Sequence, residues 1–105
     1  MNFQELAENL GLEEDEYLEL LQLFIDTSGS DMIRLQSAIE VKNGEKAVVA
    51  AHSLKGAAAN LGLMEIHEQA KKMEADARDN RFDDVAEAVP TLKNKLEVIA
   101  NLIAS

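Results

Sequence analysis

One histidine near the middle of the chain stands in a setting that suits chemistry on an exposed imidazole. His52 is followed three residues later by Lys55 and four residues later by Gly56. Residues three and four apart share one face of a helix, so a cation and a position without a side chain would flank the ring. Glycine inside a helix costs about 1 kcal/mol relative to alanine. Gly56 would lie on the outward face, where core packing does not explain it, so we infer that something large approaches the imidazole.

A neutral imidazole nitrogen can attack phosphorus and form a phosphoramidate. The phosphoryl group then carries a charge of about −2 and three acceptor oxygens. Lys55 would offset that charge as a mobile cation, and Gly56 and Ala59 would leave one side of the ring open. Val48 and Val49 lie near the same face of the helical wheel and would supply a small apolar rim for a docking partner.

Other kinds of site are poorly supported by the residues present. The chain has two histidines and no cysteine, and neither histidine has a glutamate three positions before it, as the ligands of di-iron bundles do. Ser53 follows His52 directly, and neighbouring residues of a helix point about 100° apart, so the two cannot form a nucleophile–base pair. No glycine-rich phosphate loop is present. His67 lacks a comparable motif and is expected to be a surface or boundary residue.

The helix that must position His52 is predicted over residues 45–61, after a stop and turn at Asn43-Gly44. Gly62 would close it in a left-handed conformation. On a helical wheel its apolar residues form one stripe opposite the histidine. That stripe consists mostly of small side chains: Ala47, Ala50, Ala51, Leu54, Ala57, Ala58 and Leu61. The histidine should therefore point away from the core.

Periodic apolar residues predict four further helices, over residues 3–10, 14–42, 64–79 and 83–103. The second keeps one register through Gly29 and is therefore interpreted as a single helix. Pro90 lies inside the last, where a kink is expected. Leu20, Leu23 and Phe24 widen the apolar face of the 14–42 helix. Either they cover more of the core, which we favour, or some stay exposed for a partner.

Length and composition indicate one all-α domain covering residues 1–105. Short connections make consecutive helices antiparallel, so we expect an up-down-up-down four-helix bundle with a short N-terminal capping helix. The net charge of −10 disfavours nucleic acid and anionic membranes and favours a monomer. No signal peptide or apolar run of about 20 residues is visible, so we expect a cytoplasmic protein. The start at Met1 and the lack of a linker favour a free-standing protein.

The run from His52 to Gly62, His-Ser-Leu-Lys-Gly-Ala-Ala-Ala-Asn-Leu-Gly, resembles the signature of histidine-containing phosphotransfer (HPt) domains. Those domains are four-helix bundles of bacterial and eukaryotic phosphorelays. The resemblance spans essentially the whole chain, including Leu-Phe-Ile-Asp at 23–26, the Asn43-Gly44 turn and Met73-Glu74.

The resemblance implies that His52 is the phosphorylated nucleophile, that Lys55 assists the phosphoryl group and that Gly56 gives access. Glu74 matches a position whose polar side chain hydrogen-bonds the histidine from the next helix. The phosphoryl group would come from a phosphoaspartate receiver domain or a hybrid sensor kinase and pass to a response-regulator receiver. The domain would have no cofactor or ATP site of its own, and the partner receiver would supply Mg²⁺.

Two other functions stay open at this stage. The chain could be a helical adaptor that binds a partner without phosphate chemistry, in which case His52 would be dispensable. The dimerising helix pair of a sensor kinase is less consistent with the sequence. Its histidine stands next to an acid and before a proline, whereas Ser53 follows His52 here.

Overall fold

The computed structural model describes residues 1–105 and contains five α-helices and no strand. Its helices are α1 (Phe3–Asn9), α2 (Glu14–Glu40), α3 (Gly44–Asn60), α4 (Met64–Arg78) and α5 (Phe82–Ala104). The predicted all-α class is therefore confirmed, and each predicted helix is present with ends that differ by at most two residues. None of the helices is long and apolar enough to cross a membrane.

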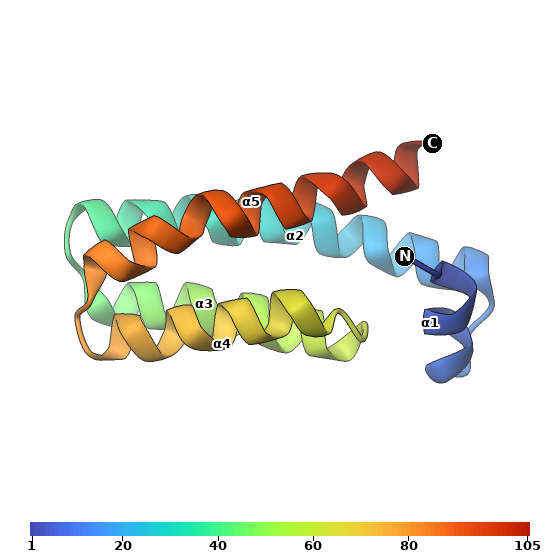
Figure 1. The fold of residues 1–105 in the computed structure, drawn as a ribbon, viewed down its shortest axis with the longest axis horizontal. Helices are drawn as coiled ribbons and strands as arrows, with labels where there is room; N and C mark the ends of the chain where they lie inside the picture. The colour runs from blue at the N-terminus through green and yellow to red at the C-terminus, as the bar shows by residue number, and fades with distance from the viewer.

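The four long helices lie side by side in two pairs, with α2 beside α5 and α3 beside α4 (Figure 1). Helices that follow one another in the chain pack against each other, and α5 also packs against α2. The α2–α3 and α4–α5 turns lie at one end, and the α3–α4 turn lies toward the other (Figure 1). With 27 residues at about 1.5 Å each, α2 spans the 41 Å long axis of the molecule.

The helix predicted over 14–42 is one helix, as its unbroken register indicated, and it continues through Gly29. It ends at Glu40, and the left-handed residue of the following turn is Lys42, with φ of 55°. Asn43 instead caps the next helix, because its side-chain oxygen accepts a 3.1 Å hydrogen bond from the backbone N–H of Lys46. The prediction that Asn43-Gly44 forms the turn itself was wrong by one residue.

Gly44 is the first residue of α3, where it meets the turn between α4 and α5. A Cβ atom there would collide with Asn80 Oδ1 and lie 3.2 Å from the backbone oxygen of Ala77. The glycine is therefore required by a close approach between two turns at one end of the molecule. Gly62, by contrast, has the predicted left-handed conformation, with φ of 73°.

The core is a single cluster that runs along the inward faces of the helices. The small-residue stripe of α3 is buried as predicted, with Ala57 only partly so. On α2, Phe24 is buried, but Leu20 and Leu23 are 43% and 58% exposed. The favoured interpretation, that all three cover the core, was therefore wrong for the two leucines, because they lie on the solvent side of the helix.

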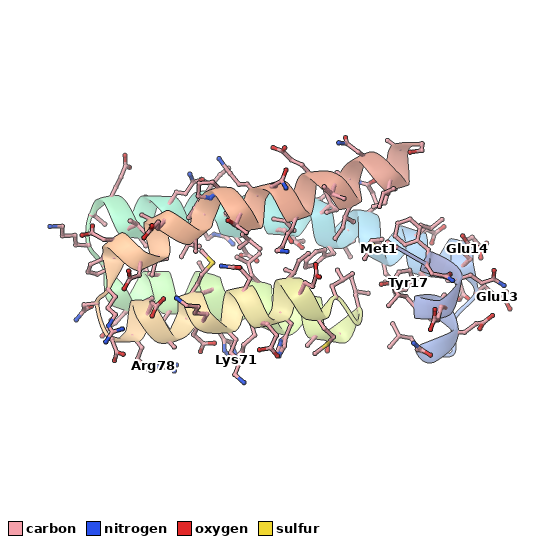
Figure 2. All side chains as sticks on the ribbon, in the orientation of Figure 1. Met1, Glu13, Glu14, Tyr17, Lys71 and Arg78 are labelled. Atoms are coloured by element: carbon pink, nitrogen blue, oxygen red, sulfur yellow. The ribbon has the colours of Figure 1, made fainter.

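The short helix α1 packs against the beginning of α2. The ring of Phe3 lies 6.5 Å from that of Tyr17, which is fully buried. The Tyr17 hydroxyl donates a hydrogen bond of 2.6 Å to the backbone oxygen of Leu61, at the end of α3. Figure 2 shows Tyr17 on α2 beside α1. This phenol therefore ties the start of α2 to the end of the helix that carries His52.

Candidate functional site

His52 lies on the outward face of α3, near the middle of the helix. Its side chain is 66% exposed, whereas the neighbouring Ala51 and Leu54 are fully buried. The alanine-rich stripe therefore positions the histidine by burying the opposite face of α3. The prediction that the imidazole points away from the core agrees with this placement.

Glu74 on α4 is buried and faces the histidine across the α3–α4 contact. Its Oε2 lies 3.2 Å from His52 Nδ1. An ionised carboxylate can only accept, so this contact assigns the ring proton to Nδ1. The other ring nitrogen, Nε2, makes no hydrogen bond and carries the free lone pair. The two helices thus hold the imidazole in the tautomer that presents an unprotonated nitrogen outward.

Two cations accompany this carboxylate. Lys55 Nζ lies 2.7 Å from Glu74 Oε1, and Arg78 Nη2 lies 3.0 Å from Glu74 Oε2. Burial alone would raise the pKa of the Glu74 carboxyl, but its three partners together outweigh burial and hold the pKa below its ordinary value. Lys55 is therefore held in an ion pair rather than extended freely into solvent.

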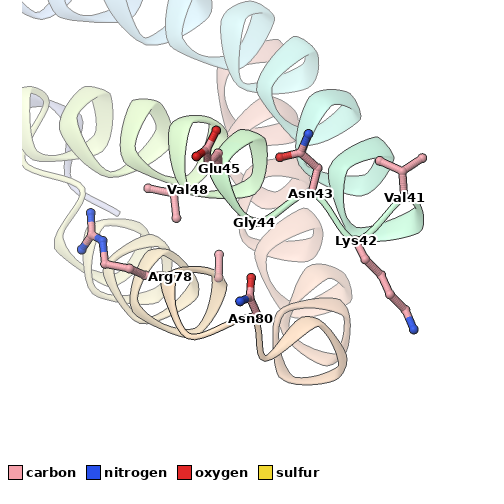
Figure 3. A pocket seen from close by; sticks show the side chains of 9 residues that line it. Val41, Lys42, Asn43, Gly44, Glu45, Val48, Arg78 and Asn80 are labelled. Carbon is pink, nitrogen blue, oxygen red and sulfur yellow. The ribbon is translucent and has the colours of Figure 1, made fainter.

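The positions predicted to admit a partner surround the imidazole on α3. A Cβ atom at Gly56 would have no atom of another element within 4 Å, and Ala59 is exposed. Val49 is 68% exposed, whereas Val48 is half-buried against the core. Figure 3 shows Val48 beside the Arg78 side chain at a hollow between α3 and α4. The structure therefore brings these residues near one another, with Val48 and Val49 on opposite flanks of the helix.

A second polar cluster beside the site was missed by the sequence analysis. Ser53 donates a 2.8 Å hydrogen bond to Asp31 Oδ2 on α2, and Arg34 pairs with Asp31 Oδ1 at 3.2 Å. Asp31 is buried. The cluster fixes the α2 side of α3 next to His52, much as Glu74 does on the α4 side. One hint of this cluster lies in the sequence: the acidic Asp31 directly precedes the apolar Met32.

The second histidine occupies a boundary position, as predicted. His67 on α4 is partly buried, and its Nδ1 lies 3.2 Å from the backbone oxygen of Lys55. The ring therefore contacts the backbone of α3 rather than the imidazole of His52. No group of three or more His, Cys, Asp or Glu side chains is placed to hold a metal ion.

An all-helical domain with one outward imidazole oriented by a buried acid is the arrangement expected of a phosphotransfer module. The family model of the Hpt domain matches residues 19–102, so the chain belongs to the Hpt domain family. Hpt domains carry out histidine phosphotransfer in two-component signalling, where they interact with receiver domains and kinases. Comparison with curated proteins and with solved structures gave no match.

Proposed function

We propose that His52 Nε2 accepts a phosphoryl group from the phosphoaspartate of a receiver domain, or from a hybrid sensor kinase, and passes it to the receiver of a response regulator. The observation that carries this proposal is the contact of 3.2 Å between His52 Nδ1 and Glu74 Oε2. It leaves Nε2 unprotonated on an exposed side chain. The carboxylate thus fixes the tautomer that such a transfer requires.

In the proposed transfer the Nε2 lone pair attacks phosphorus, and the bond between phosphorus and the aspartyl oxygen breaks. The electron pair of that bond leaves with the aspartate as its carboxylate. The ring gains positive charge as the new N–P bond forms, since Nδ1 keeps its proton. Glu74 accepts the Nδ1–H hydrogen bond and stabilises that developing charge. The reverse steps pass the phosphoryl group to the next aspartate.

The receiver is proposed to supply Mg²⁺ and the acidic pocket around the phosphoryl group. The HPt domain contributes the nucleophile, its orientation and a docking surface. Lys55 would offset phosphoryl charge, Gly56 would admit the receiver, and Val48, Val49 and Ala59 would contact it. We propose that the domain acts in the cytoplasm as a monomer. We propose that the scaffold is an up-down-up-down antiparallel four-helix bundle capped by α1.

The two histidines of the chain allow a matched test of this proposal. Parent, His52→Gln and His67→Gln are incubated with a receiver domain loaded from acetyl phosphate. We expect an acid-labile, base-stable label on the parent and on His67→Gln, and none on His52→Gln. Mass spectrometry at high pH locates the label.

An unchanged label on His52→Gln would overturn the assignment of the nucleophile. Stable binding of the receiver to a parent that never becomes labelled would instead favour the helical adaptor. Circular dichroism of each variant shows that the helices are retained, so that loss of label is not loss of fold.

A further inference from the structure

Two cationic side chains pair with the single buried carboxylate of Glu74. Its Oε1 is paired with Lys55, and its Oε2 is paired with Arg78 while also contacting His52 Nδ1. One cation is enough to neutralise one carboxylate. In a chain with a net charge of −10, a second cation at the same buried acid calls for an explanation.

The two cations differ in what else they can reach. Lys55 lies on α3, one turn after His52, and its ammonium sits on a flexible four-carbon stem. Arg78 lies on α4, one turn after Glu74, and pairs with it along the same helix. Lys55 can therefore turn toward a group on His52 Nε2, whereas Arg78 is placed to stay with Glu74. The Arg78 side chain lies along α4 and flanks Val48 in Figure 3.

We infer that Arg78 is a positioning residue that keeps Glu74 paired when Lys55 leaves it for the phosphoryl group on His52. This inference rests on the proposed phosphorylation of His52. Without Arg78, release of Lys55 would leave a buried carboxylate unpaired beside a phosphoryl group of the same sign. Lys55 would then stay on Glu74, and the phosphoryl group would lose its cation.

The inference is tested without any partner protein by loading the domain with potassium phosphoramidate. The P–N bond of the reagent breaks, ammonia leaves, and a new N–P bond forms at His52. Decay of phosphohistidine is followed by ³¹P NMR, and the Lys55 ammonium is followed by ¹⁵N NMR before and after loading. Neither readout depends on docking of a receiver.

Three variants are compared with the parent. Arg78→Gln should shorten the phosphohistidine half-life about threefold, the range of a partly exposed ion pair, and reduce the shift of the Lys55 signal on loading. Arg78→Lys should restore most of both. Lys72→Gln removes the same charge from an exposed pair with Asp76 on the same helix, and it should match the parent.

A Glu74→Gln background separates this role from direct contact between Arg78 and the phosphoryl group. With a neutral amide at position 74, Arg78→Gln should leave the half-life unchanged. Equal shortening in both backgrounds would overturn the inference, as would an unchanged half-life when Glu74 is present. Absence of any label on the parent His52 would overturn the proposed function, and the inference with it.

Discussion

At the residue scale, neither a close contact nor an unusual backbone conformation in the fold requires a glycine at position 56. A Cβ atom added there would have no atom of another element within 4 Å, and the residue has no left-handed conformation to maintain. Any residue other than proline has a higher helix propensity than glycine and should strengthen α3. We therefore propose that the glycine leaves room for a partner that approaches His52 from outside.

Replacing Gly56 should separate stability from phosphoryl transfer. Gly56→Leu is expected to stabilise the domain by about 0.5–1 kcal/mol, through helix propensity, in urea unfolding. Transfer from a phosphorylated receiver should fall at least about tenfold, because the receiver can no longer reach the imidazole in line. Rapid-quench measurement of transfer checks this.

The small donor phosphoramidate provides the control for this variant. It needs no docking surface, so its rate of loading His52 should change by less than about twofold in Gly56→Leu. Equal losses with both donors would mean that the side chain disturbs the imidazole itself. Unchanged transfer from the receiver would contradict the role in access.

The residues of the site differed in how far the sequence could predict them. His52, Lys55 and Gly56 lie on one helix, where spacing alone determines a shared face. Glu74 came from the resemblance to a family, because periodicity does not give the rotation of one helix against another. Arg78 was missed, although its spacing of four residues from Glu74 is typical of an ion pair.

At the element scale, helix interiors were predicted more accurately than helix ends. The apolar register determined which faces of α2 and α5 turn inward, because burial of that face stabilises the helix. The ends depend on contacts between turns. Lys42 adopts a left-handed conformation, and Gly44 is constrained by Asn80 and by the backbone of Ala77. Such contacts join residues far apart in the sequence.

Gly29 on α2 and Gly44 at the start of α3 offer a matched pair of substitutions. Gly29→Ala adds a methyl group with no atom within 4 Å and should stabilise the domain by about 1 kcal/mol. Gly44→Ala must displace Asn80 and crowd the oxygen of Ala77, so it should destabilise the domain by about 1–3 kcal/mol. Urea unfolding measures both, and effects of the same sign would contradict the close approach.

At the scale of the whole molecule, the fold concentrates one strongly paired acid between α3 and α4. Twenty acidic residues give the chain its net charge of −10, and most of those residues are exposed. Glu74 is the buried acid whose pKa lies below its ordinary value of 4.5. Its ionised form is therefore favoured by the folded state, and stability becomes linked to pH at this position.

Glu74→Gln should lower the free energy of unfolding by about 1 kcal/mol at pH 7. A depressed pKa in the folded state stabilises above the ordinary value and loses its effect as pH falls below it. The difference between parent and variant should therefore be constant from pH 7 to about 5 and shrink below about 4.5. Urea unfolding at each pH measures it, with the exposed Glu65→Gln as the control for net charge. A difference that does not change with pH would contradict the linkage.

The junction between Tyr17 and Leu61 gives the molecule an optical reporter of its own. Tyr17 is the only tyrosine of a chain without tryptophan, so the tyrosine band of the near-ultraviolet spectrum comes from this one phenol. Burial raises its pKa, and its hydroxyl is bonded to the end of the helix that carries His52. Absorbance and fluorescence of the unlabelled protein therefore monitor whether that end of α3 is still anchored to α2.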